Sequence, residues 1–361
     1  MKILILIRYF DFGGAENHVC ELANTLHEAG HTVVLVSRKG RQQYRLHPDI
    51  IHYPMDISTK KSPFHVVRLV QIIRRHQIDL VHAHQRLPLT IASLLGKITR
   101  TPVVGTVHSM FRQDMRKRWV RKEMRKVIVV CMNSFKGAQC DPHLKNKIYC
   151  IPNGIQLPAA PATVVPETLR IFYVSRLDKP HTQVVRFLIQ DVWPLLVKTY
   201  PEAQLTIAGD GTGMPVIQQM IREINNTEIA SSVSTTGYLS AISSEIKNAS
   251  LVIGVGRVAM ESLALGIPVL SMKNNRLGPL LTRENFDQLQ YGNFVDVEAE
   301  APTVGQFMAT ICDFISRQGY YKEEALELRK QIAVNNNIQT TTEAIVRVYE
   351  DALQSTSGKN E

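Results

Sequence analysis

A glycine turn that precedes a helix has residue types and spacing suited to binding a diphosphate. The segment Ile253–Leu270, IGVGRVAMESLALGIPVL, combines an apolar strand, a turn with Gly254 and Gly256, a helix, and a second strand that begins at Pro268. Backbone N–H groups at the positive end of a helix form a seat for an anion. Glu261, one turn into the helix, is close enough to accept hydrogen bonds from ribose hydroxyls. We expect a nucleotide-sugar site here, although an ordinary strand–turn–helix with a solvated Glu fits the segment equally well.

Cationic residues follow another expected strand, in the segment YVSRLDKPHTQ. Arg176 comes directly after the strand, with Lys179 and His181 close behind it. Cations that face an anion-binding turn neutralise the charge that grows on a departing phosphate. Arg176 and Lys179 are therefore predicted to be catalytic, although a single Arg is more often an exposed surface charge.

Glycine and histidine candidates lie in the first half of the chain. Gly13 and Gly14 open a helix after the first strand and let the backbone approach a substrate closely, but a tight turn alone also explains them. The pair does not form GxGxxG, so a nicotinamide dinucleotide is not expected. His108 ends the segment TPVVGTVH and is predicted to bind a sugar hydroxyl. His82 and His84 have no acidic or thiol residue nearby in the sequence, which favours packing over a metal site.

The net charge of +10 is distributed unevenly. Residues 1–157 contain 25 Lys and Arg against 10 Asp and Glu, whereas the remaining residues contain 17 against 22. The densest basic segment is Arg112–Lys126, in which Trp119, Val120 and two Met interrupt the charges. It suits an anionic membrane surface, where each Lys or Arg contributes about 1 kcal/mol, although a solvated basic helix is the alternative. No recognition helix, RNP-type motif or zinc knuckle is present, so nucleic acid is not an expected partner.

Membrane crossing, disulfides and bound metals are not expected from this composition. The chain has no run of about 18 apolar residues, and the apolar stretch that ends at Ile7 is short for a signal peptide. We therefore expect a cytoplasmic protein, peripheral at the inner face of the cell membrane. The five cysteines lack CxxC spacing, and most are expected to be small core residues.

Apolar, β-branched runs alternate with helix-patterned segments such as Ala15–Ala29, Phe64–His76 and Thr182–Leu196. Continuous apolarity is typical of strands that are covered on both faces. The alternation predicts an α/β protein with two Rossmann-like, doubly wound domains. The expected strands are Lys2–Ile7, Thr32–Val36, Leu80–Ala83, Val103–Val107, Val127–Val130, Ile171–Val174, Gln204–Ala208, Ser232–Thr236, Leu251–Val255 and Pro268–Leu270.

Prolines between residues 152 and 166 mark a linker between the two domains. We expect an N-terminal, acceptor-side domain at 1–157, a donor domain at 158–339, and a C-terminal helix and tail at 340–361. The sequence does not fix where this helix packs, and the N-terminal domain is one candidate. Ligands of such domains bind at the carboxyl ends of the strands, which two domains of this kind turn toward a shared cleft.

Taken together, seven motifs in order resemble the retaining glycosyltransferases of family 4, which have the GT-B fold. The resemblance implies transfer of a sugar from a nucleotide diphosphate sugar with retention of configuration and without a bound metal or other cofactor. The motifs are GGAE at 13–16, TVHS at 106–109, IPNGI at 151–155, VSRLDK at 174–179, IAGDG at 207–211, TGY at 236–238 and GVGRVAMESLALGIPVL at 254–270.

The resemblance also assigns roles to individual residues. It implies that Gly13 lies on the acceptor side, that Gly14 approaches both the donor phosphate and the acceptor side, and that His108 contacts the donor sugar. Arg176 and Lys179 would hold the diphosphate, and the phosphate turn would consist of Gly256, Arg257 and Val258. The backbone near Tyr238 would contact the base, and Glu261 would bind the ribose.

Two positions depart from the family pattern. Ile253 stands where relatives have a first glutamate that meets the donor sugar, and His181 stands where the usual spacing puts the lysine. We expect a hexosyltransferase that acts on a lipid-linked or growing cell-surface glycan, as in lipopolysaccharide or capsule synthesis. The alternatives are a catalytically silent nucleotide-sugar-binding partner, which Ile253 motivates, and a nucleotide-sugar epimerase of GT-B fold.

Overall fold

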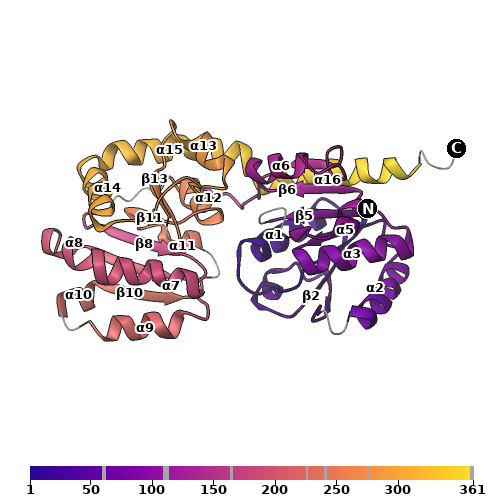
Figure 1. Cartoon of the computed structure of the whole chain (residues 1–361), viewed down its shortest axis with the longest axis horizontal. Coiled ribbons are helices and arrows are strands. Elements are labelled where there is room, and N and C mark those ends of the chain that lie inside the picture. Colours follow the sequence, from indigo (N-terminus) through magenta and orange to yellow (C-terminus); the bar gives the residue numbers. More distant parts are fainter. Residues whose placement is uncertain are drawn as a thin grey trace. The chain divides into compact units, whose positions relative to one another are not determined.

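The structure is a computed structural model that describes residues 1–58, 62–108, 114–162, 166–224, 227–239, 242–274 and 276–357. The chain folds into two units (Figure 1). Unit 1 comprises Met1–Gln156 together with Asn335–Glu361, and unit 2 comprises Leu157–Val334. Each unit has a mainly parallel sheet with helices on it, which confirms the expected α/β class with two doubly wound domains.

Unit 1 contains a seven-stranded parallel sheet in the order β3-β2-β1-β4-β5-β6-β7. Its strands are β1 (Lys2–Leu6), β2 (Thr32–Ser37), β3 (Ile51–Pro54), β4 (Leu80–His84), β5 (Val103–Val107), β6 (Lys126–Val129) and β7 (Ile148–Cys150). Its helices are α1 (Gly14–Glu28), η1 (Arg41–Arg45), α2 (Ser62–His76), α3 (Arg86–Thr99), α5 (Arg118–Glu123), α6 (Met132–Gln139) and α16 (Ile338–Ser357).

Alternate residues of each strand in unit 1 enter different cores. Ile3 and Ile5 pack in a cluster with side chains of α1 and α16, whereas Leu4 and Leu6 pack in a cluster with α2 and α3. Because successive strand side chains point to opposite faces, a continuous apolar run supplies both cores. This is why the apolar segments of the sequence predict the inner strands well.

Unit 2 contains a six-stranded sheet in the order β10-β9-β8-β11-β12-β13, in which only the β12–β13 pair is antiparallel. Its strands are β8 (Arg170–Val174), β9 (Gln204–Ala208), β10 (Val233–Gly237), β11 (Leu251–Ile253), β12 (Val269–Lys273) and β13 (Arg276–Leu280). Its helices are α7 (Lys179–Arg186), η2 (Phe187–Val192), α8 (Trp193–Thr199), α9 (Met214–Arg222), α10 (Thr227–Ser232), α11 (Ile242–Ile246), α12 (Arg257–Ala264), α13 (Phe286–Tyr291), α14 (Val304–Ser316) and α15 (Gln318–Asn335).

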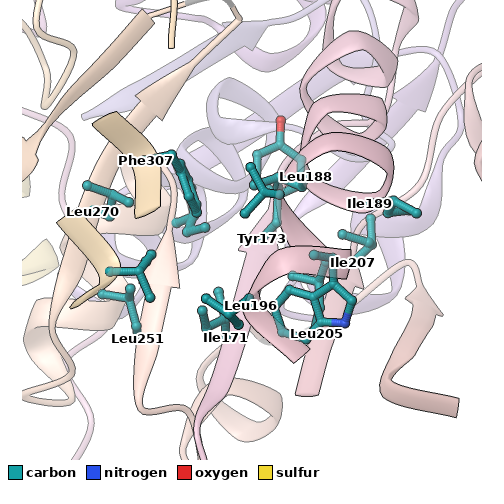
Figure 2. Close-up of a cluster of buried hydrophobic side chains, with 14 of the residues drawn as sticks. Ile171, Tyr173, Leu188, Ile189, Leu196, Leu205, Ile207, Leu251, Leu270 and Phe307 are labelled. Carbon is teal, nitrogen blue, oxygen red and sulfur yellow. The ribbon is translucent and has the colours of Figure 1, made fainter. Parts of the chain in front are cut away.

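The main core of unit 2 lies between the sheet and the segment from α7 to α8 (Figure 2). Strand residues such as Tyr173 and Ile207 face Leu188 and Ile189 of η2, and Phe307 of α14 closes the cluster. The single helix expected at Thr182–Leu196 is instead two α-helices joined by the π-helical turn η2. The extra residue of a π turn changes which side chains face the sheet.

The C-terminal helix α16 packs against α1 in unit 1. Val348 and Tyr349 are buried in the cluster that contains Ile3 and Ile5. Before this helix, Ile155 forms an isolated parallel bridge with Asn337. The chain therefore re-enters unit 1 at Asn335, a few residues before the expected boundary at 339.

Candidate functional site

Turns that carry the candidate donor-binding residues gather at one edge of the unit 2 sheet. β10, β9, β8 and β11 are parallel neighbours, so their carboxyl ends meet at the same edge. Arg176 follows β8, Tyr238 follows β10, and Gly256 follows β11. The carboxyl edge of a parallel sheet is where α/β proteins bind ligands.

The turn between β11 and α12 requires both of its glycines. Gly256 has φ 58° and ψ −127°, a conformation that L side chains rarely adopt, and its N–H donates to the carbonyl of Asn293 at 3.0 Å. A Cβ on Gly254 would lie 2.5 Å from Cγ1 of Val258. Within the described part of the chain, no side chain caps the start of α12. The turn therefore presents the N-terminal end of α12, where backbone N–H groups favour an anion.

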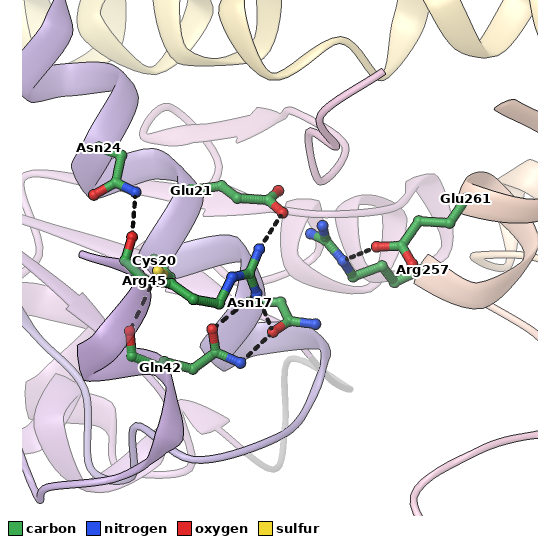
Figure 3. Close-up of polar contacts among 8 residues, drawn as sticks. All are labelled: Asn17, Cys20, Glu21, Asn24, Gln42, Arg45, Arg257 and Glu261. Atoms are coloured by element: carbon green, nitrogen blue, oxygen red, sulfur yellow. Dashed lines mark hydrogen bonds and ion pairs between the residues drawn. The ribbon is translucent and has the colours of Figure 1, made fainter. Parts of the chain in front are cut away.

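Arg257 and Glu261 form an ion pair on α12 (Figure 3). Arg257 Nε lies 2.5 Å from Glu261 Oε1, and the side chains are only 8% and 13% exposed. Residues four apart share one helix face, so the pair joins the first turn of α12 to the second. The carboxylate expected to bind a ribose thus also orients the arginine of the phosphate turn.

The cations after β8 are placed differently from one another. Arg176 is 55% exposed and its Nε lies 2.7 Å from Asp178 Oδ2, whereas Lys179 is exposed at the start of α7. His181 Nδ1 is buried without a hydrogen-bond partner among the described residues. Burial lowers the pKa of His181, Asp178 raises it, and Arg176 lowers it again, with a net shift below 6.5. At neutral pH the cationic side chains of this segment are therefore Arg176 and Lys179.

Gly13 and Gly14 of unit 1 have different surroundings: a side chain at Gly13 would clash, whereas the space beside Gly14 is open. Gly13 has φ 145°, and a Cβ there would lie 2.3 Å from Oε2 of Glu16. Glu16 Oε1 accepts a hydrogen bond from Gln85 Nε2 at 2.8 Å, which joins the turn after β1 to the turn after β4. Among the described residues, a Cβ on Gly14 would meet nothing within 4 Å, so this side of the turn is open. The expected contact of Gly14 with a substrate stays a prediction.

His108 belongs to a buried imidazole cluster made of His18, His82, His84 and His108. His84 Nδ1 lies 2.9 Å from His108 Nε2, and the two rings are stacked. The His18 ring contacts His84 and His108, with centroids 6.0 and 5.4 Å away. His18 lies on α1, His82 and His84 lie on β4, and His108 follows β5, all in unit 1, where Figure 1 labels α1 and β5. Packing of His82 against His84, with ring centroids 4.1 Å apart, agrees with the expectation that they support a neighbour.

Burial keeps three imidazoles of the cluster, those of His82, His84 and His108, neutral. It lowers the pKa of His82 to about 3 and that of His108 to about 4, and it lowers the pKa of His84 well below 6.5. His82 Nε2 lies 2.7 Å from Thr106 Oγ1, and its Nδ1 lies 2.6 Å from the hydroxyl of Tyr349. A neutral His108 acts as a hydrogen-bond donor or acceptor toward a hydroxyl rather than as a cation.

Sequence reasoning singled out His108, whose role stays a prediction, but did not identify the residues that pack around it. His18 and Tyr349 come from α1 and α16, far from His108 in the sequence. Only the i, i+2 spacing of His82 and His84, which puts both on one face of a strand, signalled the cluster.

The basic segment Arg112–Lys126 is described from residue 114 onward. Met115, Val120 and Met124 are buried in the core of unit 1, and Trp119 is packed against that core. The expectation that these apolar residues suit a membrane surface is therefore wrong for the side chains themselves. Their basic neighbours Arg116, Lys117, Arg118 and Lys122 are exposed, so the segment offers charge alone.

The burial of the cysteines and the apolar character of the helices bear on two further expectations. Of the five free cysteines only Cys20 is buried, so the prediction that most are core residues is wrong. None of the helices within the described ranges is both long and apolar enough to cross a bilayer.

Two family models match successive parts of the chain. Glycosyltransferase Family 4 matches residues 12–157, and Glycosyl transferases group 1 matches residues 168–295. The matched ranges correspond closely to the N-terminal part of unit 1 and to the unit 2 sheet.

Similar proteins of known function are distant in sequence. One subunit of the phosphatidylinositol N-acetylglucosaminyltransferase of Arabidopsis thaliana is 25% identical over 61% of this chain and 54% of its own length. The alpha-monoglucosyldiacylglycerol synthase of Streptococcus pneumoniae is 24% identical over 62% of this chain and 58% of its own. The chain thus spans little more than half the length of these relatives. Anabaena HepE, solved with UDP and glucose, has TM-score 0.75 at 17% identity and covers 97% of this chain and 99% of its own.

Proposed function

We propose that the chain, which matches two glycosyltransferase family models in succession and has a fold similar to that of GT-B glycosyltransferases, transfers a hexose from a nucleotide diphosphate sugar to a membrane lipid or lipid-linked glycan. The observation that carries the proposal is the turn between β11 and α12, where Gly254 and Gly256 expose the start of a helix beside the Arg257–Glu261 pair. A diphosphate is the group that such a helix start favours. Support for the sugar comes from Anabaena HepE, which was solved with UDP and glucose.

The donor contacts are assigned to unit 2. The diphosphate binds the turn Gly256–Val258 through the N–H groups of Arg257 and Val258, because the Gly256 N–H donates to Asn293. Glu261 accepts hydrogen bonds from the ribose. The base lies against the backbone near Tyr238. Arg257, held by Glu261 at 2.5 Å, adds a fixed positive charge beside the turn. A preorganised charge stabilises an anion without a cost of reorganisation during the reaction.

The reaction breaks the bond between the anomeric carbon and the diphosphate oxygen. Arg176 and Lys179 stabilise the negative charge that this oxygen gains, and no step requires a metal ion. An acceptor hydroxyl forms the new bond from the face that the diphosphate leaves, so configuration is retained, and its proton passes to the departing phosphate. His108, as a neutral imidazole, holds a hydroxyl of the donor sugar.

The acceptor side is assigned to unit 1, with Gly13 shaping the turn and Gly14 leaving open space for the substrates. The two relatives named above are lipid glycosyltransferases by name, which supports a lipid acceptor. Exposed basic residues near α5 attract anionic lipids, each contributing about 1 kcal/mol near the surface. The protein then works as a peripheral protein at the cytoplasmic face of the membrane.

The test is an incubation of the purified chain with each common nucleotide sugar and with vesicles that contain phosphatidylinositol, diacylglycerol or monoglucosyldiacylglycerol. We expect one donor to yield a glycolipid with an α-linkage from an α-configured donor, detected by mass spectrometry and NMR, and unchanged by EDTA. A changed free donor without acceptor would instead indicate an epimerase. Binding of a donor with no product on any acceptor would contradict catalysis.

Membrane binding is tested separately by sedimentation with vesicles. Anionic vesicles should retain the chain, neutral vesicles should not, and salt should release it because exposed charges are screened. Replacement of Arg116, Lys117 and Lys122 by Gln should abolish retention. The matched control replaces Arg74 and Arg75, which are exposed on α2, and should leave retention unchanged. Equal retention of both variants would contradict a membrane role for the basic segment.

A further inference from the structure

Three side chains in unit 1 converge near the C-terminal end of α1. The rings of His27 and His47 have centroids 4.3 Å apart, and Asp49 Oδ2 lies 3.9 Å from His27 Nε2 and 3.8 Å from His47 Nδ1. Each residue offers one atom that could bind a metal, a ring nitrogen or a carboxylate oxygen, and these three atoms all lie within 4.8 Å of one another. We call this group the His27–His47–Asp49 cluster.

We propose that the His27–His47–Asp49 cluster binds one divalent transition-metal ion, with Zn²⁺ as the natural occupant. Two imidazole nitrogens and one carboxylate oxygen form a donor set that suits Zn²⁺ and is unlike the all-oxygen sets preferred by Mg²⁺. Ligand atoms of a tetrahedral Zn²⁺ site lie about 3.4 Å apart, given metal–ligand bonds of about 2.0–2.1 Å. The two distances from Asp49 exceed this value by about half an ångström, and the ligand nitrogens of His27 and His47 lie within 4.8 Å of each other. Small movements of these partly exposed side chains would close the group around an ion.

Hydrogen bonds hold the ligand-bearing segments together. The His47 N–H donates to Asn24 Oδ1 at 2.9 Å, and Asn24 Nδ2 donates to the carbonyl of Arg45 at 2.8 Å. Figure 3 shows this link between α1 and the segment that contains Arg45. The Asp49 N–H donates to His47 Nδ1 at 3.3 Å, a long hydrogen bond that an ion at this nitrogen would replace. The ligand-bearing segments are thus held close together, and the side chains adjust when an ion binds.

The site is open to solution and separate from the proposed transfer chemistry. His27, His47 and Asp49 expose 28%, 40% and 74% of their side chains. α1 begins at Gly14 and rises about 1.5 Å per residue, so His27 lies about 20 Å from Gly14 along the helix. A bound ion would therefore join the end of α1 to the segment after η1 and stabilise unit 1, without a part in catalysis.

The experiment is calorimetric titration of ZnCl₂ into the full chain, prepared without a histidine tag and stripped with a chelator. We expect one Zn²⁺ per chain, a higher melting temperature with Zn²⁺, and no response to MgCl₂. Affinity should fall between pH 7.5 and 5.5 because imidazole must lose its proton to bind a metal. Absence of stoichiometric binding at pH 7.5 would overturn the proposal.

Variants locate the ion. His47→Ala and Asp49→Asn should each weaken Zn²⁺ binding at least tenfold and abolish the thermal shift. His143→Ala, which removes a histidine elsewhere in unit 1, should bind like the parent chain. Equal affinity of all three variants would place the ion elsewhere and overturn the proposal. Because the readout is metal binding, the result is independent of whether glycosyl transfer is found.

Discussion

Glu261 forms an ion pair with Arg257 at 2.5 Å across one turn of α12. Both side chains are largely buried, so each charge depends on the other to compensate for lost hydration. The pair makes the expected ribose-binding residue and the expected phosphate-turn residue one unit. A change to either residue should therefore affect both donor binding and stability.

Glu261→Gln should weaken donor binding and lower stability. It removes the negative charge that Arg257 needs, and loss of one partner of a buried pair costs about 3–5 kcal/mol at most. We expect the donor KM to rise at least tenfold, measured by initial rates, with a lower melting temperature. The control Glu327→Gln removes an exposed pair with Lys330 and should change stability by less than about 1 kcal/mol. An unchanged KM would remove Glu261 from the donor site.

Arg176→Ala should reduce turnover by about 100- to 1000-fold, the size of effect seen when one charge-stabilising group is lost. Its side chain is 55% exposed, so the melting temperature should hardly change. Arg186→Ala, in the helix α7 that follows and also exposed, should leave turnover as it is. Turnover of the Arg176 variant within a factor of three of the parent would contradict the assigned role.

Gly14→Ala should impair activity without unfolding the chain. A Cβ at Gly14 meets no protein atom within 4 Å, and alanine favours a helix by up to about 1 kcal/mol relative to glycine. We expect equal or higher stability together with a fall of at least tenfold in kcat/KM. The control Gly137→Ala, in α6, likewise places its Cβ where no described atom lies within 4 Å, and it should leave kcat/KM unchanged. Full activity of Gly14→Ala would show that no substrate approaches this position.

The buried imidazoles should make stability depend on pH. The pKa of His108 is lowered to about 4 and that of His82 to about 3, whereas an unfolded histidine titrates near 6.5. Below pH 6.5 the unfolded chain binds protons that the folded chain refuses. The free energy of unfolding should therefore fall as pH drops from 6.5 toward 4.

Urea unfolding at several pH values measures this slope. His108→Gln should show a shallower fall than the parent between pH 6.5 and 4, because one suppressed proton-binding site is gone. Identical slopes would contradict the assignment of a lowered pKa to His108.

Inner strands could be predicted from the sequence, whereas the edge strands β3, β7 and β13 could not; the edge strand β10 was expected, at Ser232–Thr236. Ile3–Ile7 is apolar without interruption because it supplies two cores, whereas β3 and β7 are short edge strands with weak patterns. β13 contains both Gly278 and Pro279, which argue against a strand except at an edge. The return of α16 to unit 1 depends on contacts distant in the sequence, such as the one between Tyr349 and His82.

The candidate site was predicted where a motif fixes local geometry. Gly256 and Glu261 lie on one turn and one helix, so their relation follows from spacing. Arg257 and Glu261 are four residues apart, which places them on one face of the helix. This spacing alone does not distinguish an ion pair between them from two separate contacts with a ligand. The neighbours of His108 come from separate elements, which a single sequence does not bring together.

The most direct measurement of the central claim is a structure of the chain with UDP bound. We predict that the diphosphate lies against the turn Gly256–Val258, at the N–H groups of Arg257 and Val258, with the ribose hydroxyls hydrogen bonded to Glu261. A nucleotide seated elsewhere, or a turn that stays empty at saturating UDP, would contradict this claim.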